Sequence, residues 1–548
     1  MRTRSTPGPL LLAVVLFIAL CTTLLVAATA SCDGRLTYAL DDPYVQLATA
    51  HNLSAHGVWG VTQHAFTSAA PSPLWTATLA VATLLTGPRP GWPLVLDLLA
   101  GLAVIAIAER AVRRLAPRAG RGATLAILIA VVVFAPLAPL AFTGQEHLLL
   151  AALALAFALA VARACEEPED AALVDETRPE ALLAGLAVPL TATSGEGFWL
   201  VAAAAALLYA RGRRRLAWTA LLAGLAPLVG YALVALSQGW FVLPTPLLLD
   251  ARPGDDSWHL PGLYALERLL AAPHLLVLVV AALALVGRRA PNAAPDHARA
   301  ALILFLGATG LHLQLGRIGW FERHASHLVV LGLVAVGARL SARSLTDFGS
   351  STSLELSGAA AGASRARRTR RTTLVLVMLV PLLHRGLRAA YEIPRATRDV
   401  YERQVQVGLL LAQSYRGATV AVCEPGVVSW LADAQVFDLT GLATADVARL
   451  RFSGAWNRDS LEALAREHGV RIAVVHESWF APAGGLPASW ERVGSWRIPA
   501  KVLHGDDTIS FFAAQPGERP ELERALDEYR PRLPRSVIVT SAPPARRM

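Results

Sequence analysis

Long apolar segments dominate this chain of 548 residues and limit what it can fold into. From residue 10 to residue 388, runs of about 14–22 mainly apolar residues alternate with short charged loops. A helix needs about 20 such residues to cross a bilayer. Only 17% of the residues are charged, against about a quarter in soluble domains, so most of the chain is not dissolved in water. The sequence predicts a polytopic, mostly α-helical membrane protein.

About eleven segments have the length and composition of spanning helices. They lie at residues 10–30, 91–110, 122–142, 148–164, 181–193, 197–210, 216–236, 269–287, 300–315, 326–340 and 372–388. A further apolar segment, 73–86, is short and has Pro-rich flanks, which is typical of an interfacial or re-entrant helix. The first segment ends in Ala28-Thr29-Ala30, which resembles a signal-peptidase site, but its length favours an uncleaved first helix.

Arginine-rich loops predict the orientation of the bundle. If 73–86 does not span, the N-terminus, Arg211–Arg215, Arg288–Arg289 and the linker 341–371 all lie on one side, as the positive-inside rule requires. We therefore expect a cytoplasmic N-terminus and an extracytoplasmic first loop, 31–90. The linker is rich in Ser, Ala, Gly and Arg and is expected to be disordered against membrane lipids. Because these loops explain the net charge of +9, nucleic-acid binding is not expected.

After the last predicted spanning helix, the composition becomes that of a soluble domain. Strand-like runs lie at Thr419–Cys423, Val436–Leu439, Val470–His476, Val493–Trp496 and Thr508–Ala513. A helical pattern, Asp459–His468, lies between two of them, which is typical of a small α/β domain. The predicted division is a transmembrane module over 1–390 and an extracytoplasmic α/β domain over 391–548.

Ionisable residues collect in the loops and helix ends that this topology places outside. They are Asp41, Asp42, Glu146, His147, Glu196, Asp250, Asp255, Asp256, Arg317, Arg323 and His324. Ionisable groups at membrane depth or at helix mouths are costly, so a set that opens on one face predicts a site at one end of the bundle. The three later aspartates, from Asp250 on, are interpreted as loop solvation instead.

The first loop carries the most specific motif. Asp41-Asp42-Pro43-Tyr44 begins a predicted juxtamembrane helix, and Ser72-Pro73-Leu74-Trp75 follows. Helix capping alone explains one aspartate, since Asp42 is suited to the N-cap position and Pro43 to the first helical position. Weaker motifs come later in the chain, at Thr143-Gly144-Gln145-Glu146, Ser194-Gly195-Glu196-Gly197, Arg323-His324 and Asp438–Leu442.

With these motifs the chain resembles the C-type glycosyltransferases (GT-C), and more closely the bacterial polyprenyl-phosphate-sugar-dependent mannosyl- or arabinosyltransferases. The resemblance implies an enzyme of the cell envelope in the bacterial inner (plasma) membrane. It also implies a polyprenyl-phosphate sugar donor, a lipid, glycan or protein acceptor, and a catalytic Asp in the first loop. This sequence lacks the family's Arg-Pro before Glu196-Gly197 and has His324 where the family has Tyr, so those family residues have no counterpart here.

The chemistry of the residues agrees with this resemblance. An acceptor hydroxyl that attacks a sugar needs a carboxylate base, and Asp41 is preferred because Asp42 is the better-placed cap. A guanidinium from Arg317 or Arg323 would stabilise the phosphate leaving group. The other candidates for donor or acceptor binding are Glu146, His147, Glu196 and His324. For the two glutamates, ion pairing with the arginines is an equal alternative, and His147 is also explained as a helix-mouth residue.

Other functions stay open at this point. No cofactor is expected, but Asp42 and a second carboxylate could hold a divalent metal. A transporter or flippase for lipid-linked glycans would need polar groups near mid-span, and Asp97 is the main one. A non-catalytic membrane scaffold would leave the second aspartate of the first loop unexplained.

Overall fold

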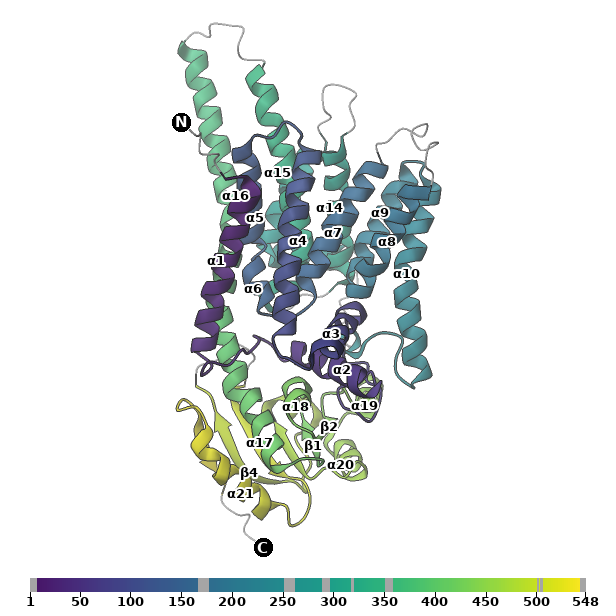
Figure 1. Ribbon diagram of the computed structural model, residues 1–548, viewed down its shortest axis with the longest axis vertical. Coiled ribbons are helices and arrows are strands. Elements are labelled where there is room, and N and C mark those ends of the chain that lie inside the picture. The colour runs from purple at the N-terminus through teal and green to yellow at the C-terminus, as the bar shows by residue number, and fades with distance from the viewer. Residues whose placement is uncertain are drawn as a thin grey trace.

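The computed structural model describes residues 7–165, 177–250, 262–287, 296–316, 320–349, 358–499, 502 and 506–542. In this part of the chain, a bundle of long helices carries a small α/β domain at one end (Figure 1). The start of α1 (Pro9–Ala30) lies at the opposite end of the bundle from that domain. The predicted fold class, a mostly α-helical bundle with a small C-terminal α/β domain, is confirmed.

The long helices of the bundle alternate in direction. They are α1, α4 (Trp92–Leu115), α5 (Arg121–Phe134), α7 (His147–Ala164), α8 (Thr177–Thr193), α9 (Gly197–Ala210), α10 (Arg214–Ser237), α13 (Pro273–Val286), α14 (His297–Leu315), α15 (Ser326–Gly349) and α16 (Gly358–Val400). Five helices in the described residues are long and apolar enough to cross a membrane, or six if one bent pair counts as a span. The chain is a multi-pass membrane protein, and the number eleven stays a prediction.

Two predicted spans are broken by proline. The segment 122–142 divides into α5, which ends at Phe134, and the short α6 (Leu137–Ala141). The segment 269–287 divides into α12 (Leu263–Ala271) and α13, which meet at an angle of 113°. Pro136 and Pro273 lie at the two breaks. Proline lacks the N–H that continues a helix, and its ring clashes with the preceding turn.

The prediction of a disordered linker over 341–371 is wrong for its helical parts. Helix α15 continues to Gly349 and α16 begins at Gly358, while residues 350–357 lie outside the described residues. Extending an existing helix adds one hydrogen bond for each residue fixed, without the cost of a new nucleus. The Ala, Leu and Arg residues of this linker are good helix formers, so both neighbouring helices propagate into it.

Burial distinguishes central from peripheral helices. Within the most apolar stretch of each helix, 72% of α7 and 83% of α15 is buried, compared with 22% of α1 and 17% of α10. The outer helices expose large apolar side chains such as Leu233 of α10, as a lipid-facing surface does. The alanines of α7 allow close contact with its neighbours. The two central helices both begin at the bundle end that faces the α/β domain.

The C-terminal domain contains one mixed sheet of six strands in the order β2-β1-β3-β5-β4-β6. The strands are β1 (Thr419–Val422), β2 (Gln435–Asp438), β3 (Ile472–Val475), β4 (Glu491–Arg497), β5 (Thr508–Ala513) and β6 (Ile538–Ser541). β1 is parallel to β2 and β3, whereas the pairs β3–β5, β5–β4 and β4–β6 are antiparallel. Its helices are α17 (Gln406–Ser414), α18 (Pro425–Leu431), α19 (Ala445–Ser453), α20 (Arg458–Glu467) and α21 (Arg519–Tyr529). Five strands and α20 lie where they were predicted.

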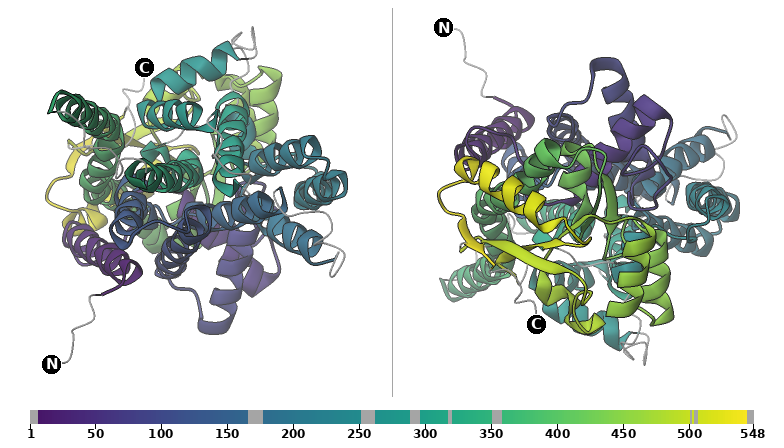
Figure 2. Two further views of the ribbon diagram at one scale, coloured as in Figure 1. Left: turned by 90° about the horizontal axis from the view of Figure 1, so that it is seen from above. Right: turned by 90° about the horizontal axis from the view of Figure 1, so that it is seen from below.

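The first loop forms two helices between the bundle and the domain. They are α2 (Asp42–His56) and α3 (Pro73–Thr86), and both lie at the end of the bundle next to α18 and α19 (Figure 1). From below, the domain lies across the bundle end with α2 and α3 beside it (Figure 2). The first loop is therefore in a position to contact both parts of the protein.

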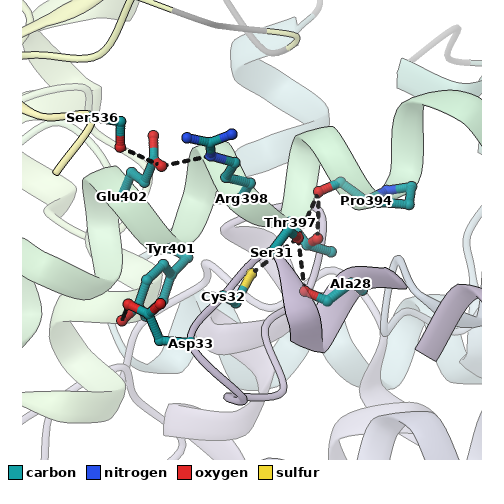
Figure 3. Close-up of polar contacts among 10 residues, drawn as sticks. All are labelled: Ala28, Ser31, Cys32, Asp33, Pro394, Thr397, Arg398, Tyr401, Glu402 and Ser536. Carbon is teal, nitrogen blue, oxygen red and sulfur yellow. Dashed lines mark hydrogen bonds and ion pairs between the residues drawn. The ribbon is translucent and has the colours of Figure 1, made fainter. Parts of the chain in front are cut away.

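Helix α16 leaves the bundle and leads into the domain. A π-helical turn, Tyr401–Val405, joins it to α17. The end of α1 is tied to this region, because Ser31 Oγ donates a hydrogen bond to the Pro394 carbonyl oxygen at 3.1 Å, and Tyr401 Oη donates to Asp33 Oδ2 at 2.9 Å (Figure 3). These contacts fix the C-terminal domain against the same end of the bundle as the first loop.

Candidate functional site

A pocket lies where the bundle, the first loop and the C-terminal domain meet, with about 580 Å³ of empty space including the solvent at its mouth. Its lining comes from segments far apart in the sequence: Asp42, Val45, Ala69, Pro71, Gln145, Glu146, Ser194, Gly195, Glu196, Pro246, Leu247, Arg323, His324 and Leu442. Five of the eight predicted site residues line it, namely Asp42, Glu146, Glu196, Arg323 and His324. The geometry thus brings together groups that the sequence places on four different segments.

Asp42 and Arg323 form an ion pair in this pocket. Asp42 is the first residue of α2, and Arg323 belongs to the 3₁₀ turn Trp320–Ala325 that precedes α15. Arg323 Nη2 donates to Asp42 Oδ2 at 2.8 Å, and Gln145 Nε2 donates to the same oxygen at 3.1 Å. The Arg323 side chain is 8% exposed and that of Asp42 45%. The carboxylate is therefore held on one side and open to the pocket on the other.

A second polar pair lies beside the first. His324 Nδ1 is 3.2 Å from Glu196 Oε1, and both side chains are buried. The ring of His147 lies edge-on to that of His324, with centroids 5.1 Å apart, and His147 Nε2 is 3.1 Å from Gln145 Oε1. His147 does not line the pocket. His147 contacts Gln145, which bonds to Asp42, and His324, which pairs with Glu196. It therefore supports both polar pairs without entering the pocket.

Glu146 is buried in the loop between α6 and α7. Gln46 Nε2 donates to Glu146 Oε2 at 3.1 Å. Burial raises the pKa of this carboxyl to about 7, despite the hydrogen bond from Gln46. The sequence analysis did not single out Gln46, although it lies one helical turn after Asp42 and so shares its face of α2. That spacing is the signal that could have found it.

Asp41 points away from the pocket and into the C-terminal domain. Its carboxylate accepts hydrogen bonds from the backbone N–H of Gly426 at 2.7 Å and of Val427 at 2.8 Å, at the start of α18. Burial, and next the negative charge of Glu424, raise the pKa of Asp41. Asp41 also occupies the N-cap position of α2, and no side chain makes the capping hydrogen bond. The expected cap by Asp42 is therefore absent, and with it the reason for preferring Asp41 as the base.

Leu442 is a lining residue that the sequence analysis noted only as part of a motif. Asp438, at the end of β2, accepts hydrogen bonds from Thr440 N at 2.8 Å and from Ala443 N at 2.7 Å. These bonds fix the turn that follows the strand and place Leu442 against Val45 of α2. The C-terminal domain thus supplies one wall of the pocket.

Three candidates cannot be placed. Arg317, Asp255 and Asp256 lie outside the described residues, and Asp250 is the last residue of α11 (Thr245–Asp250). Among the residues that the structure describes, no three or more His, Cys, Asp or Glu side chains form a group suited to a metal ion. Among the described residues of the pocket, the guanidinium of Arg323 forms an ion pair with Asp42 and neutralises the charge of its carboxylate.

Comparison with known proteins gives a fold. Residues 395–512 match the family described as "Domain of unknown function (DUF8728)", and no curated protein sequence matches the chain. The chain resembles ArnT from Cupriavidus metallidurans bound to undecaprenyl phosphate, with 14% identity over 92% of this chain and 98% of that one and a TM-score of 0.54. It also resembles the oligosaccharyltransferase AglB from Archaeoglobus fulgidus in complex with an inhibitory peptide and a dolichol-phosphate. That likeness has 11% identity, covers 97% of this chain and 76% of that one, and has a TM-score of 0.50.

These likenesses extend over nearly the whole chain, including the C-terminal domain in the case of ArnT. At such low identity they show the architecture and not the chemistry. The chain therefore shares its fold with ArnT and AglB.

Proposed function

We propose that this protein is a GT-C glycosyltransferase, which moves a sugar from a polyprenyl-phosphate donor to an acceptor hydroxyl. The observation that carries the proposal is the shared pocket of Asp42, Arg323, Glu146 and Glu196 at the junction of bundle and domain. The ArnT structure holds undecaprenyl phosphate and the AglB complex holds dolichol-phosphate, which supports a lipid-phosphate donor here.

Asp42 is the proposed general base. Its carboxylate faces the pocket, and Gln145 and Arg323 fix its orientation through one oxygen. As the acceptor oxygen bonds to the anomeric carbon, its proton passes to Asp42, and the bond from that carbon to the phosphate oxygen breaks. The polyprenyl phosphate leaves with the electron pair. A positioned base of this kind contributes about 10²–10⁴-fold to the rate.

Arg323 is the proposed partner of the departing phosphate. Its guanidinium is buried, so its charge acts at low dielectric, where stabilisation of a developing negative charge is strongest. An arginine can also contact two phosphate oxygens at once. In the resting protein Asp42 occupies one of its nitrogens, so the donor phosphate and Asp42 compete for the same guanidinium.

Glu146 and Glu196 are proposed to bind sugar or acceptor hydroxyls. Both line the pocket, and each is anchored from one side, Glu146 by Gln46 and Glu196 by His324. Carboxylates accept hydrogen bonds from hydroxyl groups, so two of them in one pocket suit a polyol. Which sugar is bound, hexose or pentose, depends on the shape of this wall.

The proposed location is the bacterial plasma membrane, with the pocket on the extracytoplasmic side. Arg113 near the end of α4 and Arg214 at the start of α10 lie at helix ends far from the C-terminal domain (Figure 1). The positive-inside rule assigns such ends to the cytoplasm. The N-terminus would then be cytoplasmic and the C-terminal domain extracytoplasmic, where polyprenyl-phosphate sugars meet cell-envelope acceptors.

The test uses the full-length protein in lipid nanodiscs, with radiolabelled polyprenyl-phosphate mannose and arabinose as donors and a cell-envelope glycolipid extract as acceptor. We expect Asp42→Asn to lower kcat by about 10²–10⁴-fold. It should bind polyprenyl phosphate at least as tightly as the wild type, because the competing carboxylate charge is gone. Arg323→Gln should weaken both binding and turnover.

Glu109→Gln is the matched control for this test. Glu109 is a largely buried carboxylate that pairs with Arg113 on α4, toward the helix end far from the pocket. This variant should transfer sugar like the wild type. Full turnover by Asp42→Asn, or polyprenyl-phosphate binding that ignores Arg323, would contradict the proposal.

A transporter is the second candidate, and Asp97 is the observation that favours it. This aspartate is fully buried in α4, and neither carboxylate oxygen has a hydrogen-bond partner in the part of the chain that the structure describes. Ionisable residues at membrane depth often mark transport pathways. If the protein moves lipid-linked substrates across vesicle membranes, Asp97→Asn should stop that movement and Asp42→Asn should leave it intact.

A further inference from the structure

The first loop and the C-terminal domain meet at the residue next to the proposed base. Asp41 is partly buried, and two backbone N–H groups at the start of α18 donate to its two carboxylate oxygens, Gly426 N to Oδ2 and Val427 N to Oδ1. Two bonds to two oxygens fix both the position and the rotation of this carboxylate. Because one peptide bond joins Asp41 to Asp42, the same contact fixes the backbone from which Asp42 projects.

Gly426 fits this contact closely. A Cβ atom added at Gly426 would overlap the Asp41 carbonyl oxygen and lie 2.7 Å from Asp41 Oδ2. Real Cβ atoms essentially never approach other heavy atoms this closely, so any side chain here would push α18 away from the first loop. Glycine at this position has a specific reason, which is the approach of the first loop.

The domain contacts α2 at two further points. The ring of Trp430, on α18, lies edge-on to that of His51 near the end of α2, with centroids 6.2 Å apart. Ala443 and Leu442, from the turn after β2, pack against Val45 in a small apolar cluster. The helix that begins with Asp42 is therefore held by the domain at its start, its first turn and its third turn.

Contacts within the first loop hold the same helix start from the other side. Tyr44 Oη accepts a hydrogen bond from Tyr38 N at 3.1 Å, and the Tyr38 ring packs edge-on to that of Tyr44 at 5.7 Å. The backbone of Tyr44 donates to the Asp41 carbonyl oxygen at 3.0 Å. Asp41 thus lies between Tyr44 of the first loop and α18, and among the contacts described its carboxylate accepts hydrogen bonds only from the domain.

From this geometry we propose that the C-terminal domain positions the base of the reaction. Gly426 and Val427 are the positioning element and Asp41 is the positioning residue, which acts through the backbone on Asp42. The inference rests on the proposed transferase function and deepens it, because it assigns Asp41 a role other than proton transfer. A base must lie within hydrogen-bond reach of the acceptor hydroxyl, and a displacement of about 1 Å can cost about 10²-fold in rate.

Two variants break the contact from opposite sides. Asp41→Asn keeps the size of the side chain but offers only one oxygen for two N–H donors. Gly426→Ala inserts a methyl group between α18 and Asp41. For both we expect kcat to fall by about 10–100-fold. The Kd for polyprenyl phosphate should stay within about threefold of wild type, since Arg323 is untouched.

Ser429→Ala is the matched control, because it removes one polar atom from the same helix without touching Asp41. It should keep wild-type kcat. The double variant Asp41→Asn with Gly426→Ala should be no slower than the slower single variant, because both changes disrupt one contact. Multiplied effects, unchanged kcat in either single variant, or parallel loss of polyprenyl-phosphate binding would each overturn the inference.

Hydrogen exchange separates this inference from the proposed function. In the wild type, the Val427 amide should exchange slowly, and Asp41→Asn should speed its exchange and that of the first turn of α2 at least tenfold. This readout does not depend on sugar transfer. If the wild type transfers no sugar from any polyprenyl-phosphate donor, the proposed function fails while the exchange data still decide whether the domain holds the loop. Unchanged exchange in Asp41→Asn would overturn the positioning role even in an active enzyme.

Discussion

Glu146 is a carboxyl whose charge at neutral pH is set by its surroundings. Burial raises its pKa from 4.5 to about 7, so the folded protein binds a proton that the unfolded chain has already released. Its contribution to stability is complete below pH 4.5 and is lost as the pH rises through 7. Glu146→Gln, which cannot ionise, should therefore gain stability relative to wild type over this range.

The size of this effect follows from the shift. A rise from 4.5 to about 7 corresponds to on the order of 2–3 kcal/mol between pH 5 and pH 8. We expect wild type and Glu146→Gln to have similar Tm values at pH 5, and the variant to be the more stable one at pH 8. Glu467→Gln, at an exposed carboxyl on α20, should show no such crossover. Parallel curves for Glu146→Gln and wild type would show that Glu146 is ionised throughout.

The candidate residues could be found from the sequence, but their relative roles could not. Asp42, Glu146, Glu196 and Arg323 stood out because ionisable residues at helix mouths are costly and rare. The ranking of Asp41 above Asp42 used local capping rules alone. What decides their orientations is α18, which lies 385 residues further along the chain. No local pattern carries that information, since Gly426 is one of 41 glycines in the sequence.

The turn between α6 and α7 shows how an element depends on one glycine. Gly144 has φ of 64°, and a Cβ atom there would lie 2.6 Å from the Tyr38 ring and 3.0 Å from Pro43 Cβ. Gly144→Ala should therefore strain the turn and displace the start of α2. We expect a loss of about 2–4 kcal/mol, from left-handed strain and overpacking together, and a fall in kcat. Thermal unfolding and transfer assays measure the two effects.

Gly212→Ala separates strain from overlap in this prediction. Gly212 has φ of 79° in the turn between α9 and α10, and apart from its chain neighbours no described residue lies within 4 Å of an added Cβ. This variant should lose only about 1 kcal/mol and keep its activity. An equal loss in both variants would mean that the contact with Tyr38 adds nothing.

Elements were predicted best where a local rule governs them. The interfacial helix 73–86 was expected with the bounds that α3 has, because prolines and glycines mark its ends. The breaks at Pro136 and Pro273 also follow from a local rule. They were missed because each proline lies within an apolar segment that is long enough to be predicted as one spanning helix. Strand β6 was missed because it is an edge strand with mostly exposed side chains, so its sequence lacks the apolar pattern that predicts a buried strand.

At the scale of the whole molecule, the pocket belongs to neither part alone. Leu442 is the domain's contribution to the pocket wall, so Leu442→Ala should enlarge the pocket without removing Arg323. We expect the KM for acceptor to change at least threefold, with the Kd for polyprenyl phosphate unchanged. Steady-state kinetics at saturating donor would measure the first and a binding assay the second.

Leu464→Ala is the control for loss of domain stability. Leu464 packs in the apolar cluster between the sheet and α20, away from the pocket. It should lower Tm without altering the KM for acceptor. If Leu442→Ala and Leu464→Ala change the KM for acceptor equally, Leu442 acts through the stability of the domain and not through the pocket wall.

The hydrogen bonds from α18 to Asp41 have a consequence for the synthesis of the protein. The ribosome completes the first loop long before it translates Gly426, and the last spanning helix also precedes that glycine. A nascent chain that has inserted its whole bundle still lacks the α18 backbone that binds Asp41 and so positions the Asp42 carboxylate. On the proposed function, such an intermediate, or a product of premature termination near residue 400, binds its lipid substrate but turns it over slowly, so full activity begins only once translocation of the C-terminus is complete.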